Sequence, residues 1–136
     1  MVIIYMVNQE NINIPFYEDL NFMIDNCEGL ILDIWGVLWD GISVYPEALK
    51  TLIKLKEKKI PTVLLSNAPR KSKVVANKLE KIGIKSNLYD KIISSGDVCR
   101  NALINNTNIV PGSKYYFIGL EEDNDLLYNT TFKQSA

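Results

Sequence analysis

The chain has 136 residues, of which 47% are hydrophobic and 23% are charged, and its formal net charge is −1 at pH 7. These values are ordinary for one globular domain, or for one domain and part of a second, and the lack of a basic field argues against nucleic acid as the main partner. Because the sequence contains no histidine, acid–base or metal chemistry would fall to carboxylate, lysine, tyrosine or cysteine side chains.

Cysteine usage and hydropathy indicate the cellular compartment. Cys27 and Cys99 are too few for a disulfide framework or a zinc site, and we expect both to be reduced thiols. No stretch approaches the roughly 20 apolar residues of a membrane span. The apolar segment 1–7 lacks the basic region and the cleavage site of a signal peptide. The sequence therefore predicts a cytoplasmic protein that has no membrane partner.

Residues 1–25 contain one predicted helix. Residues 1–14 are ambiguous between a short strand and a loosely held arm. Over 15–25, a proline suits the first turn and apolar side chains recur on one face, which indicates a helix.

The next stretch, 29–41, organises the rest of the chain. Its apolar run, Leu30 to Leu32, is too short for a helix and leads directly into Asp33. Such a run followed by glycine indicates a buried strand of a parallel sheet. Asp33 would then lie at the carboxyl end of the strand, where open α/β sheets bind their ligands.

Strand and helix patterns alternate from this point onward. Proline, apolar periodicity and a terminal glycine mark the helices, and short apolar runs mark the strands. This alternation is typical of an α/β fold with a doubly wound parallel sheet. The tail, 129–136, has no apolar period, and we expect it to be frayed. We predict helices over 46–58, 69–82 and about 98–104, strands over 61–65, 91–94 and 114–118, and a short acidic helix over 121–128.

Two strand ends carry residues suited to chemistry. Asp33 offers a nucleophile and an anchor for Mg²⁺, and Ser66 offers a hydroxyl group. The backbone amides that follow Ser66 precede a predicted helix, whose N-terminus favours anionic oxygens. Each feature alone also fits a turn former or a helix start. Because consecutive strands are often neighbours, the combination favours a phosphoryl-transfer site.

These residues resemble a known family. Residues 33–41 together with 64–67 are similar to the first two motifs of the haloacid dehalogenase (HAD) superfamily, and most of all to its class IIA. That class has a large C2 cap and includes nucleotide- and phosphoglycolate-phosphatase-like proteins. Residues 39–41, 45–46 and 94–97 extend the likeness, which covers about 20–128.

The resemblance implies a role for each matching residue. Asp33 would be the catalytic nucleophile that forms an aspartyl-phosphate, and Asp33 with the carbonyl group of Trp35 would bind Mg²⁺. Ser66 and Asn67 would bind the phosphate group of a small phosphorylated metabolite. Residues 1–104 would form the N-terminal part of a Rossmann-like HAD core, and 105–136, after a polar stretch with turn signals, the truncated beginning of the cap.

The chain departs from the family pattern in two respects. Trp35 occupies the position of the usual acid–base aspartate, and the lysine and acidic motifs that follow the cap lie beyond the chain. We therefore expect slow or absent phosphatase activity from this chain. The alternatives are a non-catalytic remnant or binding module of the same fold and, because the dehalogenase branch has an aromatic residue at that position, a metal-independent dehalogenase.

Two further expectations concern packing. Trp35 and Trp39 are predicted to be packing residues, with a substrate platform as the alternative. The first strand would have one unpaired edge, through which the chain would self-associate or bind a partner.

Overall fold

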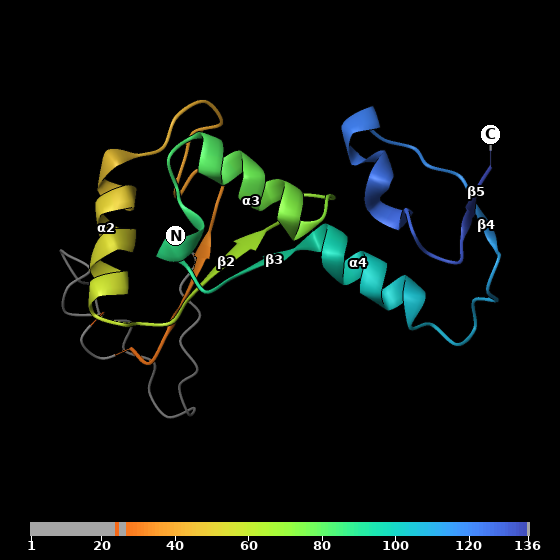
Figure 1. Ribbon diagram of the computed structural model, residues 1–136, viewed down its shortest axis with the longest axis horizontal. Helices are drawn as coiled ribbons and strands as arrows, with labels where there is room; N and C mark the ends of the chain where they lie inside the picture. Colours follow the sequence, from red (N-terminus) through yellow and green to blue (C-terminus); the bar gives the residue numbers. More distant parts are fainter. Residues whose placement is uncertain (1–23, 25–26, 136) are drawn as a thin grey trace, which may run out of the picture.

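Three short parallel strands form the centre of the molecule (Figure 1). The structure, a computed structural model, describes residues 24 and 27–135, so the predicted helix over 15–25 lies outside it apart from Ile24, which is helical and buried. The strands run in the order β1-β2-β3, and all neighbours are parallel. Their bounds are Leu30–Asp33 for β1, Thr62–Ser66 for β2 and Lys91–Ser94 for β3.

Helices connect the strands as the sequence predicts. The expected α/β fold with a parallel sheet is confirmed, and the sheet has few strands. Two helix starts differ from the prediction by three residues, at Ser72 in place of Pro69 and at Ser95 in place of about Val98. The bounds are Pro46–Glu57 for α2, Ser72–Lys81 for α3, Ser86–Leu88 for the 3₁₀-helix η1 and Ser95–Ile104 for α4.

The core lies on one face of the sheet. Leu32 pairs in register with Leu64, and Leu64 with Ile92, so these apolar side chains form a row across the three strands. They belong to the same buried cluster as Leu52 and Leu55 of α2, which are fully buried. This burial of apolar side chains is the main stabilising term of the fold.

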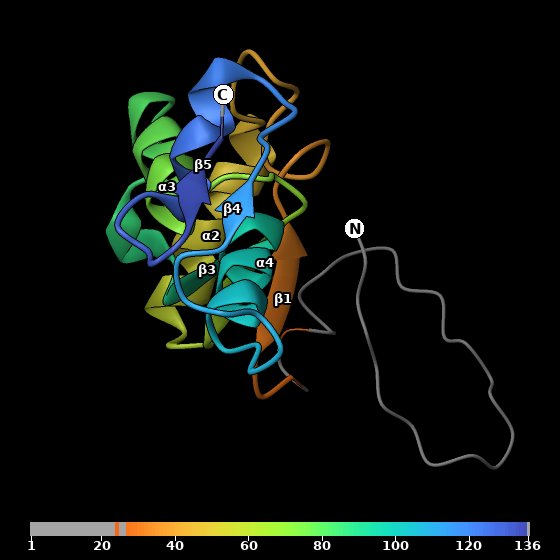
Figure 2. The same ribbon diagram turned by 90° about the vertical axis from the view of Figure 1, so that its right-hand side faces the viewer.

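The opposite face of the sheet is more open. Ile31 of β1 and Leu65 of β2 point away from the core because side chains alternate along a strand, and each remains more than 40% exposed. Within the described part of the chain, β1 pairs only with β2 and forms one edge of the sheet (Figure 2).

Residues 105–135 form a separate small unit beyond α4 (Figure 1). It contains β4 (Lys114–Tyr115), the 3₁₀-helix η2 (Glu121–Leu127) and β5 (Lys133–Gln134), and β4 pairs in parallel with β5. The predicted strand over 114–118 is thus shorter than expected. The predicted frayed tail is wrong, because backbone pairing with β4 orders it without an apolar pattern.

None of the described helices is both long enough and apolar enough to cross a bilayer.

Candidate functional site

The end of β1 presents Asp33 at the start of a tightly folded loop. Its carboxylate Oδ1 accepts a hydrogen bond from the backbone N–H of Ile34 at 2.8 Å, which orients the side chain. The loop then closes through Gly36, whose N–H donates to the carbonyl of Trp39 at 2.8 Å and whose φ of +77° favours glycine. Asp33 is therefore held by a strand on one side and by a closed turn on the other.

Asp40 stabilises the tip of this loop. Its Oδ1 accepts hydrogen bonds from the N–H groups of Ser43 at 2.7 Å and Ile42 at 2.8 Å. These two bonds, the one from Ser43 foremost, lower the pKa of the Asp40 carboxyl from its usual value. The carboxylate is thus committed to the loop backbone, which gives it a structural role.

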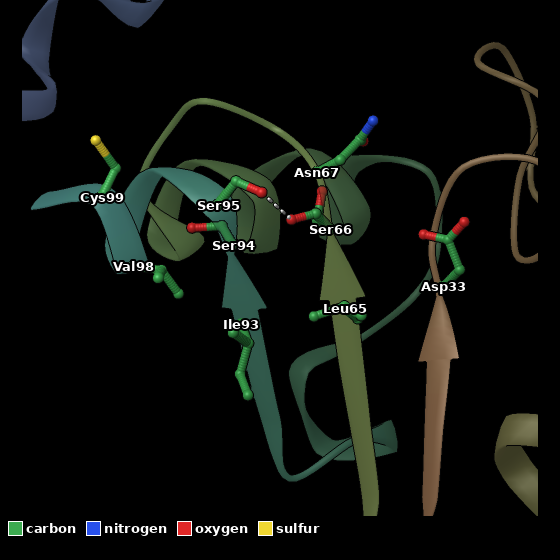
Figure 3. Close-up of a pocket in the computed structure, with 9 residues that line it drawn as sticks. All are labelled: Asp33, Leu65, Ser66, Asn67, Ile93, Ser94, Ser95, Val98 and Cys99. Atoms are coloured by element: carbon green, nitrogen blue, oxygen red, sulfur yellow. Dashed lines mark hydrogen bonds between the residues drawn. The ribbon is translucent and has the colours of Figure 1, made fainter. Parts of the chain in front are cut away.

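Three of the four predicted site residues, Asp33, Ser66 and Asn67, line one cavity at the carboxyl ends of the strands, whereas Trp35 lines a second cavity. Asp33 follows β1, and Ser66 and Asn67 lie at the end of β2, the neighbouring strand. Figure 3 shows their side chains at the same end of the sheet. The cavity has a volume of about 500 Å³ and is lined by Asp33, Leu65, Ser66, Asn67, Ile93, Ser94, Ser95, Val98 and Cys99.

The turn after β2 is held by its own side chains. The hydroxyl Oγ of Ser66 accepts a hydrogen bond from the N–H of Ala68 at 3.2 Å, and the Ser95 hydroxyl donates to the carbonyl of Ser66 at 3.5 Å. Because α3 begins only at Ser72, the amide of Ala68 belongs to this turn. The expectation that a helix N-terminus directly follows Ser66 and Asn67 is therefore wrong.

The end of β3 also contributes to the site, through contacts between segments that are distant in the sequence. Ser94 caps α4 by accepting from the N–H of Asp97 at 3.1 Å, and the Asp97 carboxylate accepts from the N–H of Ser72 at 3.0 Å. A Cβ atom on Gly96 would lie 2.5 Å from the carbonyl oxygen of Arg70, so only glycine fits. These contacts fix the starts of α3 and α4 side by side behind the cavity.

Ser94 and Ser95 are cavity residues to which the sequence analysis assigned no role, although it included 94–97 in the family likeness. The available signal was their position, because they follow β3 as Ser66 ends β2. Cys99 also reaches the cavity and is exposed, and both cysteines are free thiols, as expected.

A second, smaller cavity lies on the other side of the Ser66–Asn67 turn. It has a volume of about 230 Å³, and its walls include Trp35, Trp39, Arg70 and Lys78. The Lys78 ammonium lies 5.1 Å from the centre of the Trp39 ring, within cation–π distance. Trp39 is buried, with 8% of its surface exposed, whereas Trp35 is 65% exposed. The prediction of a packing role is confirmed for Trp39 and wrong for Trp35.

Basic residues near the site hold the C-terminal unit. Arg70 Nε lies 2.9 Å from Asp123 Oδ1, and both side chains are largely buried. Lys71 Nζ lies 3.3 Å from Asp125 Oδ2. Arg100 of α4 donates hydrogen bonds to backbone carbonyls at the end of η2. No local pattern in the sequence predicts pairs between residues more than 50 positions apart.

The residues present were tested for their fit to Mg²⁺. This ion is usually held by one or two carboxylates, water and substrate phosphate oxygens. Asp33 supplies one partly buried carboxylate, and within residues 27–135 no hydrogen bond to the carbonyl oxygen of Trp35 is found. The same residues contain no group of three or more acidic, cysteine or histidine side chains that could hold a metal ion. Among the described residues that line the cavity, Asp33 is thus the one acidic side chain, and a divalent cation there would need most of its ligands from substrate and water.

Known structures share this fold. A haloacid dehalogenase-like hydrolase from Brucella suis is 24% identical and superposes with a TM-score of 0.76 over 90% of this chain and 45% of its own. A possible sugar phosphatase of the HAD superfamily from Cytophaga hutchinsonii has 22% identity and a TM-score of 0.74 over 86% and 40% of the two chains. A 4-nitrophenylphosphatase from Thermotoga maritima has 23% identity and a TM-score of 0.56 over 68% and 35%.

The present chain spans less than half the length of these solved proteins. A comparison with curated protein sequences gives no match. The family model of the haloacid dehalogenase-like hydrolases matches residues 30–133, which is most of the chain and includes every predicted site residue. This chain therefore belongs to the haloacid dehalogenase-like hydrolases.

Proposed function

We propose that the protein hydrolyses phosphate monoesters of small metabolites through Asp33. The observation that carries the proposal is the shared cavity at the ends of β1 and β2, where the Asp33 carboxylate faces the same space as Ser66 and Asn67. A nucleophile beside hydroxyl and amide donors is the arrangement that phosphoryl transfer needs. The phosphatases among the structures of the same fold agree with this choice.

The proposed reaction has two steps. In the first, a carboxylate oxygen of Asp33 attacks the phosphorus atom, and the bond from phosphorus to the leaving oxygen breaks, which gives an aspartyl-phosphate and an oxyanion that takes its proton from water. In the second, water attacks the phosphorus atom, which releases inorganic phosphate and restores the Asp33 carboxylate. Ser66 and Asn67 orient the phosphate oxygens during both steps and donate to their developing charge.

Mg²⁺ fits the proposed role of Asp33. Asp33 and the carbonyl group of Trp35 would hold the ion, which would supply positive charge to the phosphate oxygens. The first step lacks a general acid, because the indole ring of Trp35 does not donate a proton to the leaving oxygen. General acid catalysis is commonly worth about 10²- to 10⁴-fold, so we expect slow turnover of esters whose alcohols leave poorly.

The proposal includes a setting for this chemistry. The two free cysteines support a reducing, cytoplasmic environment.

Residues 105–136 are proposed as the beginning of the cap. The exposed side chains of Tyr116, Ile118 and Leu120 support this proposal, because they offer apolar surface for further packing. The edge of β1, paired only with β2 among the described strands, is the surface we propose for self-association.

The decisive experiment compares Asp33→Asn with Asp40→Asn. Both variants remove one negative charge from the same loop, but only Asp33 lines the cavity. Turnover of 4-nitrophenyl phosphate with Mg²⁺ should fall by roughly 10³-fold or more in Asp33→Asn, because the nucleophile is lost, and should persist in Asp40→Asn. Beryllium fluoride, which mimics the aspartyl-phosphate, should bind the wild type and Asp40→Asn only.

Each other result has a distinct meaning. Turnover or beryllium fluoride binding that survives Asp33→Asn would remove Asp33 as the nucleophile. Binding that depends on Asp33 without any turnover would identify a binding protein of the same fold. Halide release from 2-haloacids that needs Asp33 and no Mg²⁺ would identify a dehalogenase.

A further inference from the structure

The exposed ring of Trp35 is an unusual feature beside the proposed nucleophile. Trp35 follows Asp33 by two residues and is 65% exposed, whereas Trp39 in the same loop is 8% exposed. A tryptophan ring that stays in water does not contribute the large stabilisation that burial of its apolar surface would give. A ring that is exposed at a site is therefore a candidate surface for ligand binding.

The ring of Trp35 lies beside Gly41 of the same loop. Gly41 has a φ of +102°, and a Cβ atom there would lie 3.4 Å from the indole Nε1 of Trp35. A glycine at this position therefore leaves space for the ring. Trp35 also forms part of the wall of the 230 Å³ cavity.

The size and the location of this cavity restrict its occupant. Ser66 and Asn67 line both this cavity and the larger one that contains Asp33, so a phosphate held by them would have the smaller cavity beside it. An apolar cavity of about 150 Å³ holds a benzene molecule. A volume of about 230 Å³ therefore accommodates a single six-membered ring with a substituent.

Leaving-group chemistry favours the same occupant. A phenol has a pKa of roughly 10, as the tyrosine side chain does, whereas an alkyl alcohol, like water, is a far weaker acid. A phenolate therefore departs without a proton from the enzyme, which suits a site that has an indole at position 35. The ammonium of Lys78, on the wall of the cavity, would stabilise the negative oxygen.

We propose that the smaller cavity is the leaving-group site and that it selects aryl phosphate monoesters with one aromatic ring. This inference rests on the proposed function. The ring of the ester stacks on Trp35 while its phosphate lies at Ser66 and Asn67. When the Asp33–phosphorus bond forms, the bond from phosphorus to the aryl oxygen breaks, the electron pair leaves on that oxygen, and the phenolate takes its proton from water.

The test measures binding separately from turnover. Isothermal titration of the full chain carrying Asp33→Asn compares phenyl phosphate with methyl phosphate. Phenyl phosphate should bind roughly fivefold to tenfold more tightly, a preference typical of one aromatic contact. Adding Trp35→Ala should reduce the preference to about one, because it removes the ring and keeps the backbone carbonyl group, and adding Trp35→Phe should retain most of the preference.

A matched control uses Ile42→Ala, which removes an 88% exposed apolar side chain from the same loop, away from the cavity. It should keep the preference. Equal binding of the two esters would overturn the inference, and so would a preference that survives Trp35→Ala. A Trp35→Ala variant that binds both esters more weakly by the same factor would also overturn it, because Trp35 would then only support the loop.

The outcomes also separate this inference from the proposed function. Turnover of phenyl phosphate that survives Asp33→Asn would overturn the proposed function, while a Trp35-dependent preference would still establish the aromatic site. The loss of all binding to both esters would overturn both.

Discussion

The sheet region, residues 27–104, and the C-terminal region, residues 105–135, are stabilised by different forces. The sheet region buries rows of leucine and isoleucine between its strands and α2. The C-terminal region exposes Ile118 almost completely and is attached through Arg70–Asp123, Lys71–Asp125 and the hydrogen bonds of Arg100. Apolar burial involves no charge that salt could screen or acid could neutralise, whereas ion pairs weaken with both. The two regions should therefore respond differently to mutation and to solvent.

The largest expected effect comes from the core of the sheet region. Leu52→Ala removes a fully buried side chain of α2 and should lower the free energy of unfolding by about 2–5 kcal/mol. Ile53→Ala, at the next position, truncates a side chain that is 41% exposed and should cost less than about 1 kcal/mol. Urea unfolding followed by circular dichroism measures both, and equal losses would contradict the assignment of the core face.

A smaller and local effect is expected at the junction of the two regions. Asp123→Asn leaves the largely buried Arg70 guanidinium without its carboxylate and should cost about 1–3 kcal/mol in the C-terminal region. Asp125→Asn is the control, because its side chain is 41% exposed and such pairs are worth about 0–1 kcal/mol. Hydrogen exchange should quicken over 121–127 in Asp123→Asn while β2 stays protected, and faster exchange in β2 as well would show that the regions unfold together.

The smallest effect concerns acid stability of the sheet region. The Asp90 carboxylate accepts a hydrogen bond from the N–H of Thr62 at 2.7 Å, and this bond, helped by Lys56, lowers the pKa of Asp90 in the folded chain. The stabilisation is complete above the unfolded-state pKa of about 3.9 and is lost as pH falls through the lower folded-state pKa. Asp90→Asn should therefore flatten the acid limb of the stability curve, and an acid limb identical to that of the wild type would contradict this account.

The comparison also explains which elements the sequence predicted well. The strand over 91–94 was predicted with its observed bounds because two isoleucines are flanked by polar residues. The start of α3 was not predicted correctly. The carboxylate of Asp97, 25 residues away, accepts a hydrogen bond from the N–H of Ser72 and fixes the helix start there. β5 escaped prediction because backbone pairing with β4, and not a side-chain pattern, orders it.

The properties of the candidate site also divide into those that the sequence predicted and those that it did not. That Asp33 and Ser66 share a cavity followed from the sequence, because two short apolar runs end in them and the carboxyl ends of parallel strands meet at one edge of a sheet. The different exposure of Trp35 and Trp39 did not follow, because both residues have similar neighbours in the chain. Only the path of the loop places one ring in the core and the other beside the cavity.

The sequence by itself determined the alternation of strands and helices, the parallel sheet, and the strand ends that carry Asp33, Ser66 and Asn67. These properties are local, since apolar periodicity and turn residues act over a few positions. The tertiary structure alone decided the pairing of Arg70 with Asp123, which are 53 positions apart, and the contact that leaves room only for Gly96. Those properties depend on the path of the whole chain, because ion pairs and close backbone contacts form only between segments that the fold has already brought together.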